Sequence, residues 1–339
     1  MRVGCHCYGV VYVMKQAWGF AVAAAVLSLS SRCAFAQEFT LFAGPLVSGS
    51  DHSYSWEMNY MEGFGTYFAG SVSWLNEGHI PGHHRDGQSI QAWARLPLDN
   101  RRFVFALGAG PYRYFDTEAA KQGLGYSNTH GWGAVYSARA TWYASNRWTA
   151  NLQLNRVSVT RGPSTTALML GIGYQLDAPD TPGPRDFALP RTHNVTNNEI
   201  TLMAGETILN SLESETSAAE SIEYRRGITH WLDGSIGYLH EGSGLTARRD
   251  GATAQLWLTR AFLDDCLTLG FGAGLYAAIH HGDAEDQRDT GDGILSGLVS
   301  VSASYRFSDH WDARVTWNRV VTRYSRDTDV ILGGIGYRF

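Results

Sequence analysis

The densest group of potential metal ligands in the sequence lies in one short segment, NEGHIPGHHRDG, from Asn76 to Gly87. Three imidazoles and a carboxylate can bind zinc or another divalent ion. A solvated surface loop is the competing interpretation, because the second copy has Ser243, Ala247 and Arg248 at the positions of the three histidines. The predicted metal-binding residues are His79, His83, His84 and Asp86.

No nucleophile, base and acid in the sequence have the spacing of a catalytic motif, so no catalytic residue is predicted. Ser127 with His130, or His280 or His281 with Asp283, forms a dyad only if the fold brings the two side chains together. The segment GDAEDQRDTGDG, 282–293, offers carboxylates to Ca²⁺, but it lacks the loop length and the final glutamate of an EF-hand. A solvated loop explains this segment better, and no cofactor is expected.

The composition is typical of strands that alternate apolar and polar residues. The chain has 38 Gly, 11 Trp, 17 Tyr and 14 Phe, and only 17% of its residues are charged. After the first 36 residues no uninterrupted apolar run reaches the roughly 20 residues that a membrane helix needs. Strands that cross lipid must close into a barrel, because lipid does not tolerate unpaired backbone groups. The composition therefore favours a transmembrane β-barrel.

Residues 1–36 have the organisation of a secretory signal peptide. Lys15 precedes the apolar stretch from Phe20 to Leu29, and Ala34-Phe35-Ala36 is a cleavage signal before Gln37. The segment from Met14 to Ala36 is already a complete leader, so translation is expected to start at Met14 or at the first residue of the sequence. We expect the mature chain to begin near Gln37.

Cleavage of this leader would change both the cysteine content and the net charge. Cys5, Cys7 and Cys33 would be removed, so Cys266 would remain without a partner for an internal disulfide. The mature chain would carry 24 basic and 32 acidic residues, a net charge of −8. An acidic chain of this kind is not expected to bind nucleic acid.

The mature sequence is an internal duplication. GSVSWLNEG, Gly70 to Gly78, recurs as GSIGYLHEG, Gly234 to Gly242, and RWTANLQLNRV, Arg147 to Val157, recurs as HWDARVTWNRV, His310 to Val320. Between the copies, Asp177 to Asn198 holds four of the nine prolines and reads as a linker. The predicted organisation is a signal peptide at 1–36, a first repeat at 37–176, a linker at 177–198 and a second repeat at 199–339.

Eight segments of the first copy alternate with period two, and the second copy has eight more at matching places. Tight turns alternate with longer connections, as periplasmic turns alternate with external loops in outer-membrane barrels. The segments Asn76 to Gly87 and Asp116 to Gly131 are therefore expected to be external loops. The eight predicted strands are 39–47, 53–61, 66–75, 88–96, 103–115, 132–143, 148–160 and 166–176.

The alternation also predicts which side chains face lipid and which fill the interior. Buried charges require partners, so a mixture of carboxylate, guanidinium and amide groups suits a hydrogen-bonded plug, with Gly108 and Gly110 leaving room for it. The predicted plug comprises Glu57, Gln91, Arg95, Arg139, Asn155, Gln255 and Asn318. Aromatic residues at strand ends form the girdles of membrane barrels, and the predicted girdle comprises Trp142, Trp148, Tyr174, Trp311 and Tyr337.

The last strand ends with Ile335, Tyr337 and Phe339 on alternate positions. This pattern resembles the C-terminal assembly signal of the bacterial outer-membrane β-barrel superfamily, in which Tyr337 and Phe339 would be the signal residues. Each copy is similar in size to the small eight-stranded members. The resemblance implies location in the outer membrane of a Gram-negative bacterium, with outer-membrane lipid, lipopolysaccharide and the outer-membrane assembly machinery as partners.

Two tandem eight-stranded barrels are the predicted fold, because each copy keeps its own closing motif, Gly171 to Tyr174 or Gly334 to Tyr337. One sixteen-stranded barrel is the alternative. Eight strands leave an interior that side chains fill, whereas sixteen leave an aqueous channel. The predicted function is therefore a non-enzymatic outer-membrane protein with a plugged interior, whose external loops contact the envelope surface or ligands. The alternatives are a general porin and a lipid A-modifying esterase, although the His-x-Ser-Asn pattern of lipid A deacylases is absent.

Overall fold

A computed structural model describes residues 38–119, 125–177, 179–186, 194–242, 249–281 and 294–339. The predicted signal peptide and the acidic segment 282–293 lie outside the described residues. The described chain is all-β. Within these ranges no helix is long and apolar enough to cross a membrane.

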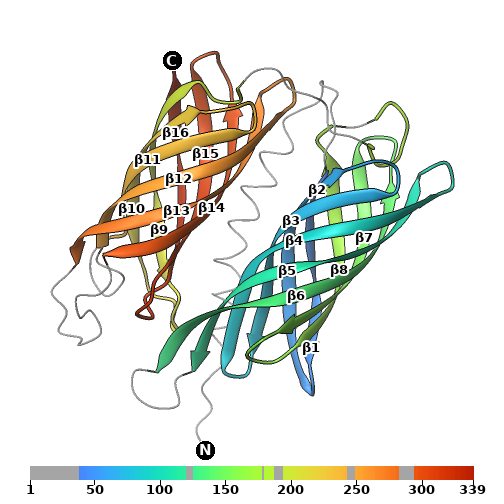
Figure 1. Cartoon of the computed structure of the whole chain (residues 1–339), viewed down its shortest axis with the longest axis horizontal. Helices are drawn as coiled ribbons and strands as arrows, with labels where there is room; N and C mark the ends of the chain where they lie inside the picture. The colour runs from blue at the N-terminus through green and yellow to red at the C-terminus, as the bar shows by residue number, and fades with distance from the viewer. Residues whose placement is uncertain (1–37, 120–124, 178, 187–193, 243–248, 282–293) are drawn as a thin grey trace, which may run out of the picture. The chain divides into compact units, whose positions relative to one another are not determined.

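Sixteen strands follow one another along the chain (Figure 1). The first eight are β1 (Glu38–Ser48), β2 (Asp51–Gly63), β3 (Phe68–Ile80), β4 (His83–Leu98), β5 (Phe103–Ala119), β6 (Tyr126–Tyr143), β7 (Trp148–Val159) and β8 (Thr165–Gln175). The second eight are β9 (Asn198–Leu209), β10 (Thr216–Gly227), β11 (Leu232–His240), β12 (Arg249–Phe262), β13 (Leu267–His281), β14 (Leu295–Arg306), β15 (Trp311–Val321) and β16 (Thr328–Arg338).

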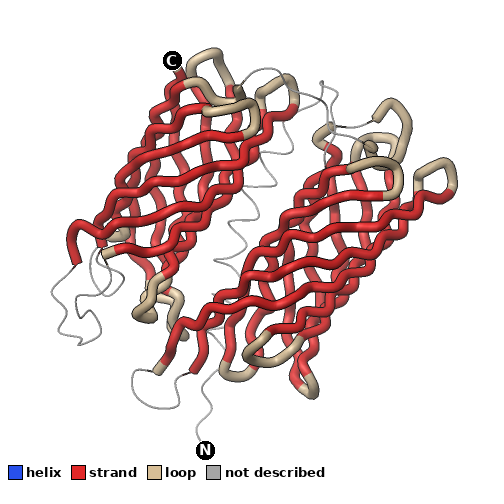
Figure 2. The backbone as a smooth tube through the Cα atoms, in the orientation of Figure 1, coloured by secondary structure: helices blue, strands red, loops and turns tan. Residues whose placement is uncertain are grey.

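Each set of eight strands closes into its own antiparallel barrel. In the first barrel β1 pairs with both β2 and β8, and Phe42 is opposite Gly171. In the second barrel β9 pairs with both β10 and β16, and Met203 is opposite Gly334. Figure 2 shows that strands make up nearly the whole of each barrel. The prediction of two tandem eight-stranded barrels is confirmed, and the sixteen-stranded alternative does not form.

The strands have an inside-out pattern, with polar side chains buried and apolar side chains exposed. In β7, Asn151 and Gln153 are buried, whereas Leu152 and Leu154 are exposed. Because successive side chains of a strand point to opposite faces, the amides face the barrel interior and the leucines face outward. An apolar outer wall around a polar interior is the pattern of a membrane barrel.

The connections differ at the two ends of the barrels. The β4–β5 turn is tight, and Asp99, Asn100 and Arg101 adopt left-handed φ angles of 46°, 50° and 72°. The segment Asn76 to Gly87, expected as an external loop, is instead a hairpin in which β3 and β4 continue to Ile80 and His83. That expectation was wrong because Gly, Pro and His suggested a loop, whereas strand pairing continues beyond a β-bulge between Asn76 and His79.

The predicted loop Asp116 to Gly131 is likewise shorter than expected. β5 continues to Ala119 and β6 begins at Tyr126, so most of this segment belongs to a long hairpin. Polar composition suggested a loop, but cross-strand pairing extends through it.

The linker is bonded to both barrels where the structure describes it. Arg101 donates hydrogen bonds to the Pro184 carbonyl (2.7 Å) and to the Asp186 carboxylate (2.5 Å), at the end of the first barrel that carries the tight turns. At the corresponding end of the second barrel, Arg338 donates to the Val195 carbonyl over 2.6 Å. The linker therefore contributes backbone acceptors to one end of each barrel.

Candidate functional site

The centre of both barrels is crossed by the same chain of hydrogen bonds. In the first barrel the amide of Gln91 donates to Ser137 (2.9 Å), whose hydroxyl donates to the Asn155 carbonyl oxygen (2.7 Å). In the second barrel Gln255 donates to Ser300 (2.8 Å), which donates to Asn318 (2.6 Å). These residues occupy matching positions of the two repeats, so both copies retain this polar chain.

A buried tryptophan fills the space beside this chain in each barrel. The indole N–H of Trp93 donates to the Ser71 hydroxyl, and that of Trp257 donates to the Ser235 hydroxyl, each over 2.9 Å. Both indoles are fully buried. A buried indole needs a hydrogen-bond acceptor, and the serine of the neighbouring strand supplies it.

The first barrel holds one central carboxylate, that of Glu57, surrounded by neutral donors. Its two oxygens accept hydrogen bonds from Gln153 (2.7 Å), Asn155 (2.9 Å) and Ser73 (2.8 Å). Gln153 also accepts from Arg139 over 2.6 Å, so one amide links the carboxylate to the nearest guanidinium. Charge-assisted bonds of this kind stabilise a charge that is buried away from water.

The second barrel places its charges differently. Glu223 accepts hydrogen bonds from Arg225 (3.1 Å) and Arg314 (3.0 Å), and Arg314 also pairs with Glu199. The Arg225 guanidinium lies 3.8 Å above the centre of the Trp257 ring. The position matching Glu57 is Ser221, so the central carboxylate has moved by two residues along the strand between the copies.

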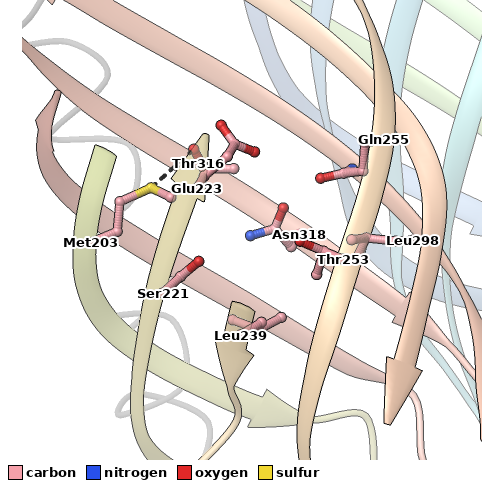
Figure 3. Close-up of a pocket in the computed structure, with 9 residues that line it drawn as sticks. All are labelled: Met203, Ser221, Glu223, Leu239, Thr253, Gln255, Leu298, Thr316 and Asn318. Atoms are coloured by element: carbon pink, nitrogen blue, oxygen red, sulfur yellow. Dashed lines mark hydrogen bonds between the residues drawn. The ribbon is translucent and has the colours of Figure 1, made fainter. Parts of the chain in front are cut away.

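Only a small cavity is left beside these charges in the second barrel. Its volume is ≈ 10 Å³, about what one water molecule requires. Glu223, Asn318 and Gln255 line it together with Ser221 and Met203 (Figure 3). A cavity of this size is too small for an organic substrate.

The end of each barrel opposite the tight turns holds a buried ion pair that is also duplicated. Arg85 donates to both oxygens of Glu77, over 2.5 and 2.8 Å, and Tyr112 donates to the same carboxylate over 3.0 Å. Arg249 donates to both oxygens of Glu241 over 2.8 and 3.1 Å. Thr165 and Thr328 donate a further hydrogen bond to their respective carboxylates.

The predicted plug residues all lie inside the barrels. Trp93 packs face to face with the Arg139 guanidinium at 4.6 Å, and Gly108 leaves the space that the indole occupies. Arg95 lies at the end of the first barrel that carries the tight turns, and it donates to the Gly65 carbonyl over 2.6 Å. The buried residues of the predicted set are Glu57, Gln91, Arg95, Arg139, Asn155, Gln255 and Asn318.

The structure does not gather the four predicted metal-binding residues at one point. His83 faces the interior and bonds to Asp116 at 2.9 Å, whereas the rings of His79 and His84 contact each other at 4.3 Å. Asp86 lies on the outer face of β4, opposite to Arg85. In the described chain the ligand atoms that converge belong instead to His83, Asp116 and Glu118.

The candidate dyads are not assembled in the described residues. The His130 ring bonds to the Asp327 carboxylate at 2.6 Å rather than to Ser127. Asp283, the other candidate acid, lies outside the described residues. In the described geometry His130 therefore does not act as a base toward Ser127.

Around the outside of each barrel runs a belt of exposed apolar side chains with aromatic residues at its edge. Trp148 packs edge-on against Tyr174 at 5.1 Å, and Trp311 packs in the same way against Tyr337 at 5.0 Å. Trp142, Trp148, Trp311 and Tyr337 are exposed, while Tyr174 is buried beneath its neighbours. The terminal Phe339 is exposed and stacks on Tyr337.

No protein-family model matches the chain, and no curated protein sequence matches it. Among solved structures it is similar to the N-terminal β-barrel domain of OprF from Pseudomonas aeruginosa, at 12% identity over 42% of this chain and 98% of that one, with a TM-score of 0.33. It is similar to Ail of Yersinia pestis at 11% identity, over 42% and 99% of the two chains, with a TM-score of 0.33. The NanC porin aligns at 8% identity over 89% and 100%, with a TM-score of 0.21.

These likenesses are weak, and the assignment rests on the closed strand pairing, the apolar belt and the aromatic edges. Both copies have the fold of a small eight-stranded transmembrane β-barrel, the kind of barrel that the sequence predicted.

Several residues inside these outer-membrane barrels were missed in the sequence. Ser71 and Ser137 complete hydrogen bonds that both barrels contain, and Tyr112 adds a bond to Glu77, but serine and tyrosine alone gave no signal. The repeat supplies such a signal, because Ser235 and Tyr276 are the residues at the positions of the second copy that match Ser71 and Tyr112. An inward-facing polar residue that is identical in both copies of a duplicated barrel is the pattern that would have found them.

Proposed function

We propose that this protein is a non-enzymatic outer-membrane protein whose two barrels are plugged by their own side chains. Its external hairpins and loops then interact with the envelope surface or with ligands. The observation that carries the proposal is the duplicated interior, in which a buried Trp–Ser pair, a Gln–Ser–Asn chain and a Glu–Arg rim pair succeed one another in each barrel.

The arrangement supports a closed barrel rather than a pore for two reasons. Eight-stranded barrels have an interior just wide enough for side chains to fill. The central carboxylates Glu57 and Glu223 have hydrogen-bonded partners, and so do the rim carboxylates, so little free energy is gained by admitting water around them. A porin needs a continuous aqueous path, which this packing opposes.

Conductance in a planar lipid bilayer tests the proposal. The chain from Gln37 onward would be refolded, shown to be inserted by its heat-modifiable mobility, and recorded at fixed voltage. We expect no steady currents. A variant that shortens the plug in the first barrel, Trp93→Ala with Arg139→Ala and Gln91→Ala, should conduct if it folds. Steady currents of porin size from the unaltered chain would overturn the proposal.

The absence of an enzymatic role is tested separately by the mass of lipid A from cells that express the protein. An unchanged mass is expected. A shift that corresponds to the loss of an acyl chain would replace the proposal with the lipid-modifying alternative. Substitution of His130 by Ala would then show whether this histidine takes part.

A further inference from the structure

Three ionisable side chains interrupt the apolar outer wall near its external edge. Asp86 of β4, Arg319 of β15 and Asp329 of β16 point away from the interior of their own barrels, because Arg85 and Val330, their neighbours in sequence, point inward. Their exposed fractions are nevertheless only 6%, 3% and 9%. Ionised side chains on a lipid-facing wall are unfavourable unless they are paired.

The depth of this cluster follows from strand geometry. With a rise of about 3.3 Å per residue and a tilt of about 40°, Arg319 lies roughly 20 Å above the girdle residue Trp311, in a belt about 25 Å tall. The cluster is therefore close to the level of the outer-leaflet headgroups.

The guanidinium of Arg319 is shared between a carboxylate of its own barrel and a carboxylate of the other barrel. It donates to Asp329 over 2.6 and 2.8 Å, and to the two oxygens of Asp86 over 3.0 and 2.6 Å. The bond to Asp86 is bidentate, which is the strongest geometry of an arginine–carboxylate pair. One guanidinium thus bridges acids on both barrels.

Tryptophans surround this ion pair. Trp317 of the second barrel packs on Trp74 of the first with ring centres 4.2 Å apart, and Trp56 lies 5.9 Å from Trp317. The Trp317 indole N–H donates to Asp329 over 2.8 Å. Aromatic packing around a paired charge excludes water and lipid headgroups that would compete for it.

The external rims add polar contacts beyond the belt. His130 bonds to Asp327 at 2.6 Å, and Asn128 donates to the Asn210 carbonyl over 2.8 Å. The Asp327 backbone N–H donates in turn to the Asn128 side chain over 3.1 Å. These contacts continue the pairing of the two barrels above the ion pair.

The two copies have diverged at the positions that make these contacts. Arg156, the first-copy match of Arg319, is exposed and bonds only within its own barrel, to Thr166 at 2.9 Å. Thr166 is the match of Asp329, so the first copy lacks the second acid. Trp317 of the second copy matches Leu154 of the first. Trp74 and Trp56 of the first copy match Tyr238 and Glu220 of the second. Both copies thus retain the interior residues, whereas each of these outer-wall residues occurs in only one copy.

We propose that the two barrels associate within the membrane through this wall, with the Arg319–Asp86 pair at its centre, and that the linker is not needed to hold them together. The association goes beyond the proposed plugged function and would give the protein one continuous external surface made from the rims of both barrels. The partner surface of each barrel is the other barrel of the same chain.

Cleavage of the linker provides the test. A protease site would be placed between residues 187 and 193, an affinity tag on the second barrel, and the cut protein purified in mild detergent. We expect the first barrel to copurify with the second. Arg319→Asp should release it, and the exchange Arg319→Asp with Asp86→Arg should restore copurification, because a guanidinium on the first barrel then faces acids of the second.

Arg156→Asp is the matched control, since it makes the same charge change at the equivalent wall position of the first copy. It should leave copurification unchanged. Each half must keep its heat-modifiable mobility, so that release is not confused with unfolding. Separation of the unaltered halves, or equal behaviour of the Arg319 and Arg156 variants, would overturn the proposal.

Cross-linking in intact membranes removes any effect of detergent. With Cys266→Ser as background, Trp74→Cys with Trp317→Cys should form a disulfide that keeps the cut halves together on a non-reducing gel. Trp132→Cys with Trp317→Cys is the control, because Trp132 is exposed on the outer wall of the first barrel. Equal cross-linking of both pairs would mean random collision rather than a defined interface.

Discussion

Gly108 lies directly against the indole of Trp93, and a Cβ at that position would come within 2.5 Å of the ring atom Cδ2. Gly272 has the same relationship to Trp257, at 2.7 Å. Neither glycine has a left-handed φ, so the need for glycine here is steric. Each barrel makes room for its buried tryptophan by removing a side chain on the next strand.

Gly108→Ala is expected to destabilise the first barrel by about 1–3 kcal/mol, because the added methyl group overpacks a filled interior. Gly272→Ala should have a similar effect in the second barrel. Gly333→Ala is the control, since an added Cβ would meet no atom within 4 Å there. Urea unfolding in detergent micelles, followed by Trp fluorescence, measures the change. A Gly108 variant as stable as the Gly333 variant would contradict the steric argument.

Ser71→Ala is expected to cost about 1–3 kcal/mol, because it leaves the buried indole N–H of Trp93 without its acceptor. The double variant Ser71→Ala with Trp93→Phe removes both partners, so the hydrogen-bond part of the loss should largely disappear. Ser145→Ala, in an exposed turn, serves as the control for the loss of a hydroxyl. The same urea midpoints report the result, and a Ser71 variant equal to the Ser145 control would refute the role of the bond.

Glu77→Gln should destabilise the external end of the first barrel by about 3–5 kcal/mol, because Arg85 is left buried without its counter-charge. Glu77→Gln with Arg85→Met should be less harmful than the single change, since no unpaired charge remains. Glu206→Gln, on the exposed face of β9, controls for the loss of a carboxylate. If the single and double variants unfolded at the same urea concentration, the ion pair would not be the stabilising element.

The sequence predicted the barrels and much of their interior because alternation with period two assigns a face to every strand residue. Glu57, Asn155 and Gln255 were found in this way. The same rule separates Arg85 from Asp86, because adjacent strand residues point to opposite faces. Asp86 is on the outer wall, where its partner is more than two hundred residues away in the chain.

The linker shows a different limit. Asp177 to Asn198 was predicted to be a linker because its composition has no alternation, yet Arg101, Gln175 and Arg338 bond to its backbone. Backbone carbonyls are present in every residue, so no residue type marks such contacts. Only the positions of the arginines in the tight turns could have suggested them.

The attachment of the linker to the first barrel should depend on pH through Asp186. Burial alone would raise the pKa of this carboxyl, but the hydrogen bond and charge of Arg101 outweigh burial and hold the pKa below its usual value. A lowered pKa in the folded state means that the contact stabilises the fold at pH above the pKa of the unfolded chain. This contribution is lost as the pH falls through the folded-state pKa.

Hydrogen exchange of the Gly65 amide, which donates to the Asp186 carbonyl over 2.6 Å, reports this attachment. At neutral pH the unaltered protein should protect this amide more than Asp186→Asn does, because only the charged carboxylate attracts Arg101. The difference should disappear at acidic pH, where both side chains are neutral, and comparison at each pH cancels the intrinsic pH dependence of exchange. Asp180→Asn, in the same segment, should match the unaltered protein throughout. A difference that persisted in acid would show that shape rather than charge holds the linker against the barrel.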